Sequence, residues 1–121
     1  MDFADIYILR FLNINAQQSS AMIYYTQLIF IKEGKESSFH FFEDQVLPLL
    51  KQHNGELIYR IRPSVSSVVA TTLGHPYEIH LVTFSDRKSF ESYRDDPQRL
   101  KHMHLKDESV ERIMLIEGTA L

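Results

Sequence analysis

The sequence contains no cysteine among its 121 residues. Disulfide bonds, thiolate zinc sites, iron–sulfur clusters and a cysteine nucleophile are therefore excluded. Positive charge is also scarce, because 13 Lys and Arg residues stand against 16 Asp and Glu residues and leave a net charge of −3. A mildly acidic chain lacks the basic surface that nucleic-acid binding usually requires, so we expect no nucleic-acid partner.

Long apolar runs are missing as well, so the sequence predicts no membrane-spanning segment. Asp2 and Asp5 stand where a signal peptide would carry basic residues, which favours a cytoplasmic location without a membrane partner. What the chain does contain is ordinary for a globular protein, with 44% hydrophobic and 24% charged residues. Its length suits one domain with a hydrophobic core of its own.

Most of the chain alternates between strand-like and helix-like segments. The strand-like segments are rich in β-branched and aromatic residues, whereas the helix-like segments repeat apolar residues every three or four positions. These patterns predict strands over residues 22–31, 56–62, 77–84 and 111–117. They predict helices within residues 37–55, after Asp86 and after Asp96. For residues 65–73, both a continued strand and a long loop fit the pattern.

Several residues mark the ends of the first helix. Ser37 or Ser38 is the expected N-cap. Asn54, followed by Gly55, supplies a left-handed stop. Pro48 lies inside this helix and removes one backbone hydrogen bond, so we expect a kink there.

The order strand–helix–strand, repeated once, favours a ferredoxin-like α+β fold. In this βαββαβ arrangement four strands form one antiparallel sheet, and both helices cover the same face. We assign this single domain to residues 21–121. Residues 1–20 are treated as an N-terminal arm, whose apolar pattern fits either a short helix or a strand.

The predicted sheet is apolar on both faces. One face would carry Ile58, Val82, Phe84, Met114 and Ile116, and the other Leu57, Ile61, Ile79, Leu81, Ile113 and Leu115. Helices cover only one face, and a monomer rarely leaves a large apolar face in water. The pattern therefore predicts a homodimer that buries the sheet face opposite the helices.

Two long segments of the chain resemble one known superfamily. They are GKESSFHFFEDQVLPLLKQHNGELIYRIRP, residues 34–63, and PYEIHLVTFSDRKSFESY, residues 76–93, followed by the Asp96–Pro97 break and the terminal LIEG. Over residues 22–121 this pattern is similar to the dimeric α+β barrel superfamily, and within it to the branch called domain of unknown function 1330.

The resemblance implies a dimer in which two ferredoxin-like subunits join their sheets into a barrel, with the helices outside and a cavity within. Relatives in this superfamily include small-molecule monooxygenases, lactone isomerases, dehydratases, haem enzymes and plain ligand-binding domains. No catalytic residue carries over from the branch. The histidine and aspartate pattern of the isomerases has no counterpart in this sequence.

Charged side chains on two predicted strands form the main candidate site. Arg60 and Arg62 share one face of the second strand, and Glu78 and His80 share one face of the third. These strands are antiparallel neighbours in the proposed fold, so the four side chains should meet. We expect them to point away from the helices into the dimer barrel and to bind the ligand there.

Buried charges are costly unless they are paired, which points either to a ligand or to a structural ion-pair network. With a ligand, His80 is the candidate general base and Glu78 could orient it. Arg60 or Arg62 could then clamp a carboxylate or enolate oxygen. Without a ligand, the same residues form an Arg–Glu network at the rim of the dimer.

The stretch RLKHMHLKDE, residues 99–108, carries two histidines that raise the question of a metal site. On one continuous helix His102 and His104 lie about 200° apart around the axis, so they cannot bind one ion together. We expect a charged helix outside the barrel and no metal site. The residues expected in water are Lys101, Lys106, Asp107 and Glu108.

The sequence favours a protein that binds a small organic molecule in the barrel cavity, without a cofactor. The first alternative is a cofactor-independent monooxygenase or isomerase that acts on a planar aromatic or lactone substrate, and the second is a purely structural dimer. A cavity of about 300 Å³ or more beside the candidate site would favour a ligand. A cavity filled by Tyr and Phe would favour the structural dimer.

Overall fold

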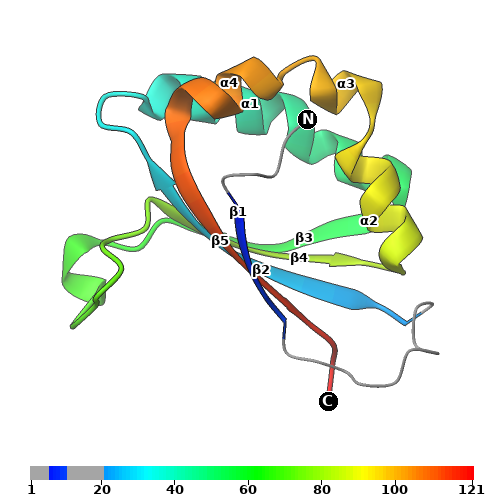
Figure 1. Cartoon of the computed structure of the whole chain (residues 1–121), viewed down its shortest axis with the longest axis horizontal. Coiled ribbons are helices and arrows are strands. Elements are labelled where there is room, and N and C mark those ends of the chain that lie inside the picture. The colour runs from blue at the N-terminus through cyan, green and yellow to red at the C-terminus, as the bar shows by residue number, and fades with distance from the viewer. Residues whose placement is uncertain (1–5, 11–20) are drawn as a thin grey trace.

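The protein consists of one sheet with helices on one face. A computed structural model of the chain describes residues 6–10 and 21–121. Figure 1 shows the helices packed above the sheet, with α1 and α4 side by side. In chain order the elements are β1 (Ile6–Arg10), β2 (Ile23–Ile31), α1 (Glu36–Val46), the 3₁₀ helix η2 (Leu47–His53), β3 (Gly55–Ile61), the 3₁₀ turn η3 (Val65–Ser67), β4 (Glu78–Phe84), α2 (Arg87–Arg94), α3 (Pro97–Leu100), α4 (Met103–Ser109) and β5 (Val110–Gly118).

The described sheet has five strands in the order β1-β5-β2-β4-β3. The last four are antiparallel neighbours in the order of a ferredoxin-like sheet, which confirms the predicted fold class. β1 runs parallel to β5 at the edge of the sheet. Of the two alternatives for the N-terminal segment, the strand is therefore correct for residues 6–10. The rest of residues 1–20 lies outside the described residues.

α1 begins earlier than predicted. Its N-cap is Lys35, so the prediction of Ser37 or Ser38 is wrong. The reason is a tight turn just before the helix. Gly34 adopts a φ of +78°, and the Lys35 N–H donates a hydrogen bond to the Lys32 carbonyl at 3.1 Å. The chain therefore reaches helical geometry before it arrives at the serines.

The predicted kink at Pro48 takes the form of a change in helix type. α1 ends at Val46, and the chain continues as η2 with Pro48 in its first turn. Pro48 has no N–H to donate, so the regular α-helical ladder cannot continue through it. Asn54 then adopts the left-handed conformation with a φ of 54°, and its N–H donates to the Leu50 carbonyl. The predicted stop is therefore confirmed.

The predicted continuous helix over residues 99–108 is wrong. α3 ends at Leu100 and α4 begins at Met103, with His102 as its N-cap. The His102 N–H donates to the Arg99 carbonyl at 3.0 Å, a 3₁₀-type bond that tightens the turn between the two helices. None of the described helices is long and apolar enough to cross a membrane.

The helices cover the sheet face that we expected to point away from them. Glu78, His80, Val82 and Phe84 of β4 are all buried, and the last two belong to the core with η2 and α2. The predicted assignment of faces is therefore wrong for β4. Apolar character could not separate the faces, because both faces of the sheet are apolar.

A bulge in β3 explains the error on that strand. Leu57 and Tyr59 pair with adjacent residues of β4, so Ile58 is an extra residue between them. The alternation of side chains shifts by one position at the bulge. Leu57 and Arg60 consequently share the helix-covered face, whereas Tyr59 and Ile61 lie on the other face and are 62% and 53% exposed.

The face opposite the helices is apolar, as predicted. The strand register places one row of apolar side chains across β5, β2, β4 and β3, namely Met114, Leu28, Ile79 and Ile61. A second row beside it consists of Ile116, Thr26, Leu81 and Tyr59. Within the described chain, no helix or loop packs over these two rows in Figure 1.

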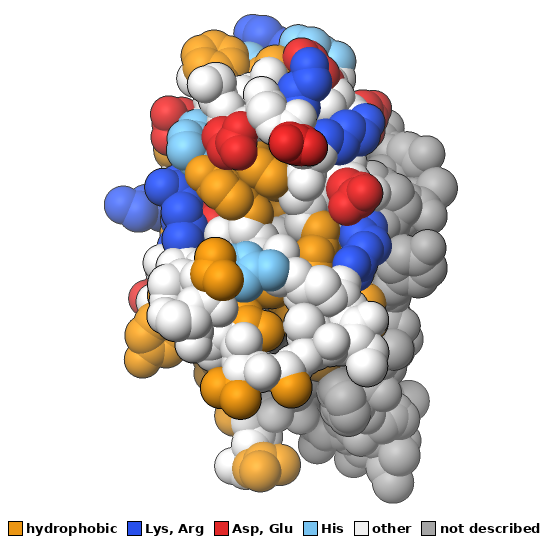
Figure 2. Space-filling model, turned by 90° about the vertical axis from the view of Figure 1, so that its left-hand side faces the viewer, with side chains coloured by type: hydrophobic (Ala, Val, Ile, Leu, Met, Phe, Trp, Pro, Cys, Tyr) orange, Lys and Arg blue, Asp and Glu red, His pale blue; other side chains and the backbone are white. Residues whose placement is uncertain are grey.

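Residues 62–77 between β3 and β4 form a long loop and do not continue the strand. The loop contains η3 and projects from one end of the sheet, at the left of Figure 1. Figure 2 faces this end and shows apolar side chains on its lower part, with most of the charged side chains above them. Val65 and Val69 are almost fully exposed there. The loop therefore adds apolar surface at this end of the molecule.

Candidate functional site

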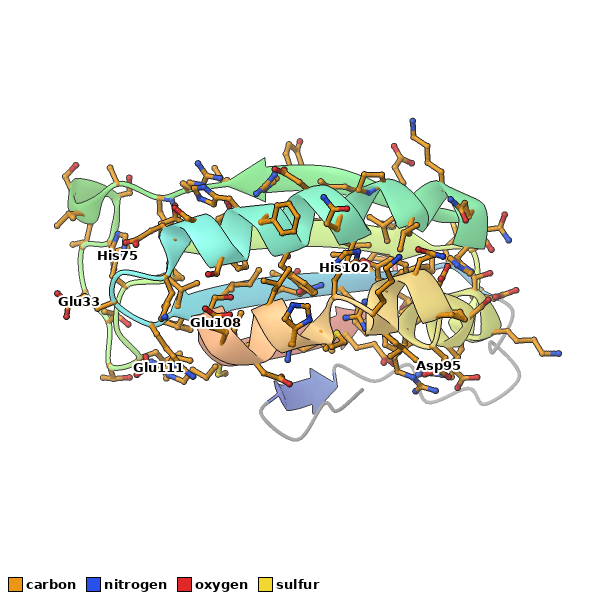
Figure 3. All side chains as sticks on the ribbon, turned by 90° about the horizontal axis from the view of Figure 1, so that it is seen from above. Glu33, His75, Asp95, His102, Glu108 and Glu111 are labelled. Carbon is orange, nitrogen blue, oxygen red and sulfur yellow. The ribbon has the colours of Figure 1, made fainter. Side chains whose placement is uncertain are left out.

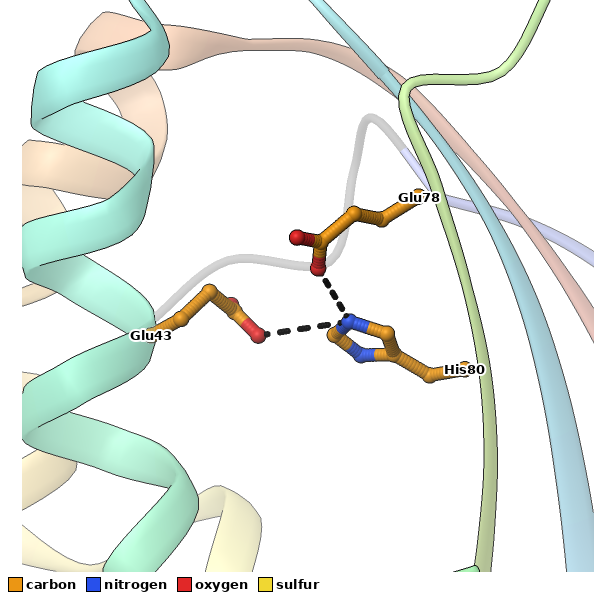
Figure 4. Close-up of side chains that lie close together, drawn as sticks. All are labelled: Glu43, Glu78 and His80. Carbon is orange, nitrogen blue, oxygen red and sulfur yellow. Dashed lines mark hydrogen bonds and ion pairs between the residues drawn. The ribbon is translucent and has the colours of Figure 1, made fainter. Parts of the chain in front are cut away.

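The four charged residues singled out from the sequence meet on the helix-covered face of the sheet. Glu78 and His80 project from β4, whereas Arg60 reaches Glu78 from the neighbouring edge strand β3 and Arg62 from the position just after it. Figure 4 shows Glu78 and His80 pointing toward Glu43 of α1. The expectation that this group points away from the helices into a barrel is therefore wrong.

Glu78 is the anionic centre of the cluster. Its carboxylate accepts hydrogen bonds from Nε of Arg60 at 2.9 Å, Nε of Arg62 at 2.5 Å and Nε2 of His80 at 2.7 Å. Burial alone would favour the protonated form, but these three donors outweigh it and hold the pKa of Glu78 at about 2. Glu78 is therefore ionised at neutral pH.

Glu43 of α1 belongs to the site and was missed in the sequence analysis. It is 5% exposed, and its Oε2 atom lies 3.6 Å from Nε2 of His80. Among the described residues, Oε2 has no hydrogen-bond partner. Burial disfavours the charged form and raises the pKa of Glu43 to about 7, although the nearby His80 and Arg60 act against the rise. Glu43 thus changes between acid and carboxylate near neutral pH.

The spacing of α1 contained a signal for Glu43. It lies four residues after Phe39 and three before Val46, both of which are buried. Helical periodicity therefore places it on the buried face of the helix. A glutamate at such a position is rare unless it is paired or functional, so it should have been included among the candidates.

His80 lies between two carboxyl groups whose pKa values are shifted in opposite directions. Because Glu78 is ionised, we assign the proton of Nε2 to the hydrogen bond that His80 donates to Glu78. The remaining nitrogen, Nδ1, is then a hydrogen-bond acceptor. Glu78 thus fixes the orientation and tautomer of His80, as an orienting carboxylate does in acid–base sites.

A cavity of about 60 Å³ lies beside Glu43 and His80, between the helices and the sheet. Its walls are mostly aliphatic and aromatic, which is typical of small-molecule sites with a few orienting polar groups. Its charged and amide lining consists of Gln27, Glu43, His80, Arg99 and Lys106. The volume is below the roughly 300 Å³ that we expected of a ligand site, so the cavity does not meet that criterion and accepts water or a group of a few heavy atoms.

Two cations of the cavity wall come from the stretch that we expected to lie in water. Lys106 is 2% exposed, so the prediction of a solvated side chain is wrong for this residue. Arg99 is also buried, and its guanidinium lies over the ring of Tyr93, 5.1 Å from the centroid. Arg99 belongs to α3 and Lys106 to α4, so the two residues do not lie on one regular helix. Helical periodicity alone could not predict this break.

Glu43, Glu78 and His80 also offer ligands for a metal ion, because one ligand atom from each lies within 4.8 Å of the others. A cation at this point would have to displace the Nε2 proton that His80 donates to Glu78. It would also compete with Arg60 and Arg62, which already pair with the Glu78 carboxylate. The residues therefore fit a metal ion poorly.

A second polar cluster joins η2 to α2 and α3 outside the cavity. Nδ1 of His53 lies 2.8 Å from Oγ of Ser92, and Nε2 lies 2.6 Å from Oδ2 of Asp96. Ser92, His53 and Asp96 follow the order of a serine–histidine–aspartate relay. Such a relay also needs N–H donors that stabilise an oxyanion. At the adjacent start of α3, the Gln98 N–H is bound to Asp96 and Pro97 has none. We interpret the cluster as a structural link.

His102 and His104 lie apart from the Glu43–His80 cluster. The ring of His102 makes an edge contact with Phe41, with 6.4 Å between the centroids. Figure 3 shows His102 at the turn before α4. His104 is exposed on α4. The two rings thus occupy separate surface positions of the helix layer.

Comparison with known proteins identifies structures of the same fold. No family model and no curated protein matches the chain. A protein of unknown function from Rhodopseudomonas palustris has a TM-score of 0.73 at 12% identity, over 84% of each chain. A dabb family protein with a ferredoxin-like fold from Mesorhizobium loti has a TM-score of 0.63 at 16% identity, over 83% of this chain and 97% of that one. A dimeric protein of unknown function and ferredoxin-like fold from Bacteroides fragilis has a TM-score of 0.61 at 10% identity, over 82% and 96%.

These similarities establish the fold. They support the ferredoxin-like architecture that the resemblance to the dimeric α+β barrel superfamily implied. Identities of 10–16% carry no activity from one protein to another. The function must therefore be argued from the site.

Proposed function

We propose that the protein binds a small organic molecule in the cavity between its helices and its sheet. The observation that carries this proposal is the buried carboxyl group of Glu43, which lines the cavity with an oxygen that lacks a hydrogen-bond partner among the described residues. An unsatisfied buried polar group costs about 1–3 kcal/mol. Such groups concentrate where a ligand or a reaction needs them.

Glu43 and His80 make the polar contacts to this ligand in our proposal. Four ligand-binding residues were predicted from the sequence. Of these, His80 lines the cavity, whereas Arg60, Arg62 and Glu78 are not among its lining residues. These three then act by positioning. The two arginines hold Glu78 in its ionised form, and Glu78 holds His80.

Proton transfer to or from the ligand is the second candidate function. It is favoured by the contrast within the cluster, since Glu43 titrates near pH 7 while Glu78 remains ionised and orients His80. Pairs of groups with separated pKa values are typical of acid–base sites. An isomerase or a cofactor-independent monooxygenase would use such a pair, with His80 as the general base.

We also propose how two copies of the chain assemble. The apolar face opposite the helices fits a second copy of the chain, and the Bacteroides fragilis protein of the same fold is described as dimeric. We therefore propose a cytoplasmic homodimer that joins its two sheets, within the branch that the sequence resembles. The cavity of each subunit would then lie on the helix side of its own sheet.

A thermal-shift screen of small acids, amides, alcohols and lactones tests the proposed binding. A ligand at 100 times its Kd should raise the free energy of unfolding by roughly 2.7 kcal/mol. Glu43→Leu removes the unpaired carboxyl group, so it should fold and should lose this response. Glu36→Leu, an exposed position at the start of the same helix, is the matched control and should keep it.

Two results would contradict the proposal. One is a screen in which no compound class stabilises the wild-type protein. The other is a ligand that stabilises Glu43→Leu as much as the wild type, because binding would then take place elsewhere.

A further inference from the structure

The unpartnered oxygen of Glu43 indicates which chemical group a ligand should bring into the cavity. Oε2 lies 3.6 Å from Nε2 of His80, but that nitrogen donates its proton to Glu78. Among the described residues, no other group supplies a hydrogen bond to Oε2, which is buried and belongs to a residue of the cavity wall. A donor for this oxygen must therefore come from a molecule inside the cavity.

His80 offers a second hydrogen-bond acceptor on the same wall. Because Nε2 carries the proton that it donates to Glu78, Nδ1 holds a lone pair. The two members of the cluster that line the cavity are therefore both acceptors when Glu43 is ionised. A hydrogen bond to an ionised acceptor is roughly twice as strong as one between neutral groups. A ligand that donates hydrogen bonds thus gains more from this wall than one that accepts them.

The cations of the cavity wall do not require an anionic ligand. Arg99 and Lys106 both have interactions within the protein. One guanidinium nitrogen of Arg99 donates to the Arg94 carbonyl at 3.2 Å, and the guanidinium lies over the ring of Tyr93. An anionic ligand would be repelled by ionised Glu43, and a cationic ligand would be repelled by Arg99 and Lys106. An uncharged ligand avoids both costs.

Resting on the proposed function, we propose that the ligand is a small uncharged molecule whose N–H or O–H group donates a hydrogen bond to Oε2 of Glu43. The cavity volume of about 60 Å³ limits this molecule to a few heavy atoms. Small amides and alcohols have the required donor. Ketones of the same shape have none, so they leave the ionised oxygen of Glu43 without a partner.

The pH should change the affinity for such a donor. Burial raises the pKa of Glu43 to about 7, so the carboxylate gains population as the pH rises through this value. A donor binds the carboxylate more tightly than the acid, so its affinity should rise with pH, by up to tenfold per unit below pH 7. A ketone would bind the acid form instead, and its affinity would fall as the pH rises. The titratable and charged groups around Glu43 and its cavity are His80 and Glu78 of β4, Arg60 of β3, Tyr25 of β2, Tyr93 of α2, Arg99 of α3 and Lys106 of α4.

Titration with matched probes, followed by NMR, tests this inference. Acetamide and 2-propanol are compared with acetone, and 2-pyrrolidinone with cyclopentanone, at pH 6 and pH 8. The members of each set have the same heavy-atom skeleton and differ in the N–H or O–H group. At pH 8 at least one donor should bind fivefold or more tightly than its ketone. Its affinity should fall several-fold, by up to tenfold, at pH 6.

Glu43→Gln keeps the shape of the side chain and cannot ionise. It should lose most of the pH dependence and most of the preference for donors over ketones, because its amide group both donates and accepts. Glu36→Gln changes an exposed position at the start of the same helix and should bind the probes like the wild type. An unchanged preference in Glu43→Gln would overturn the inference, because another group would then accept the hydrogen bond.

The remaining outcomes separate this inference from the proposed function on which it rests. Ketones that bind as tightly as their donor counterparts at pH 8 would overturn the donor class and leave the proposed small-molecule function in place. Failure of every probe would also overturn the inference, and the wider thermal-shift screen then decides the proposed function by itself.

Discussion

Glu43 and Glu78 are two carboxyl groups in one cluster whose pKa values are shifted in opposite directions. Glu78 is held ionised by three N–H donors, and its pKa is about 2. Glu43 has no such donors on Oε2, and burial raises its pKa to about 7. His80 lies between them and bonds to the ionised one. The local hydrogen bonds, and not the residue type, thus decide which carboxyl group can exchange a proton at neutral pH.

Glu43 should make the protein less stable at higher pH. Its pKa in the folded state is about 7, against an ordinary value of 4.5, so the folded chain keeps a proton that the unfolded chain releases between these values. This contribution to stability is fully present below pH 4.5 and is lost as the pH rises through 7. At about 1.4 kcal/mol per unit it amounts to about 3 kcal/mol. Urea unfolding of the wild type and Glu43→Gln between pH 4.5 and pH 8 measures the difference. Parallel stability profiles of the two proteins would contradict the assignment.

Glu78→Gln should destabilise the protein by about 3 kcal/mol at neutral pH, because it leaves the buried ring of His80 and the guanidinium groups of Arg60 and Arg62 without their anion. The folded pKa of Glu78 is depressed, so its contribution is present above pH 4.5 and is lost as the pH falls toward 2. Glu56→Gln, an exposed position on the neighbouring strand, should change stability by less than about 0.5 kcal/mol. Equal unfolding free energies for the two variants would refute the central role of Glu78.

At the scale of the elements, propensity and periodicity predicted which strands and helices exist, but not where they break. The strands over 22–31 and 77–84 and the stop at Asn54 followed from local sequence. The bulge at Ile58 did not, because nothing in an alternating strand marks the extra residue. The turn between α3 and α4 was missed for a similar reason. It has no glycine or proline, and a 3₁₀-type bond forms it.

The start of β3 offers a test of how tightly the elements pack. A Cβ atom on Gly55 would lie 2.7 Å from a ring carbon of Phe84, which is buried and packed against Phe90 and Tyr93. Gly55→Ala should therefore lower the free energy of unfolding by about 1–3 kcal/mol, as overpacking usually does. Gly118→Ala meets no atom within 4 Å and should change stability little. Chemical denaturation that gave both variants the same stability would contradict this packing.

At the scale of the whole molecule, the two apolar faces of the sheet explain both the success and the error of the sequence analysis. They correctly predicted a sheet with an apolar face left uncovered by helices. They could not tell which face receives the helices, because hydrophobicity was similar on both. The polar residues Glu78 and His80 suggested an exposed or inter-subunit face, whereas they are buried beneath α1 with Glu43.

The uncovered face should hold two copies of the chain together. Ile61→Asp places a charge in one of the apolar rows of this face. The equilibrium between a dimer of twice 14.2 kDa and the monomer should then shift toward the monomer. Phe41→Asp changes an exposed apolar residue on the outer side of the helices and should leave the dimer intact. Light scattering at micromolar concentration measures both. A wild-type monomer, or equal dissociation of the two variants, would refute the proposed interface.

The central claim is that a buried carboxyl group at Glu43 stands ready to exchange a proton in the cavity beside His80. A ¹³C NMR titration of the Glu43 side-chain carboxyl carbon tests it most directly. The structure predicts a midpoint at about pH 7 in the free protein. A midpoint near the ordinary value of 4.5 would contradict the account, because Glu43 would then be solvated or hydrogen-bonded as an anion.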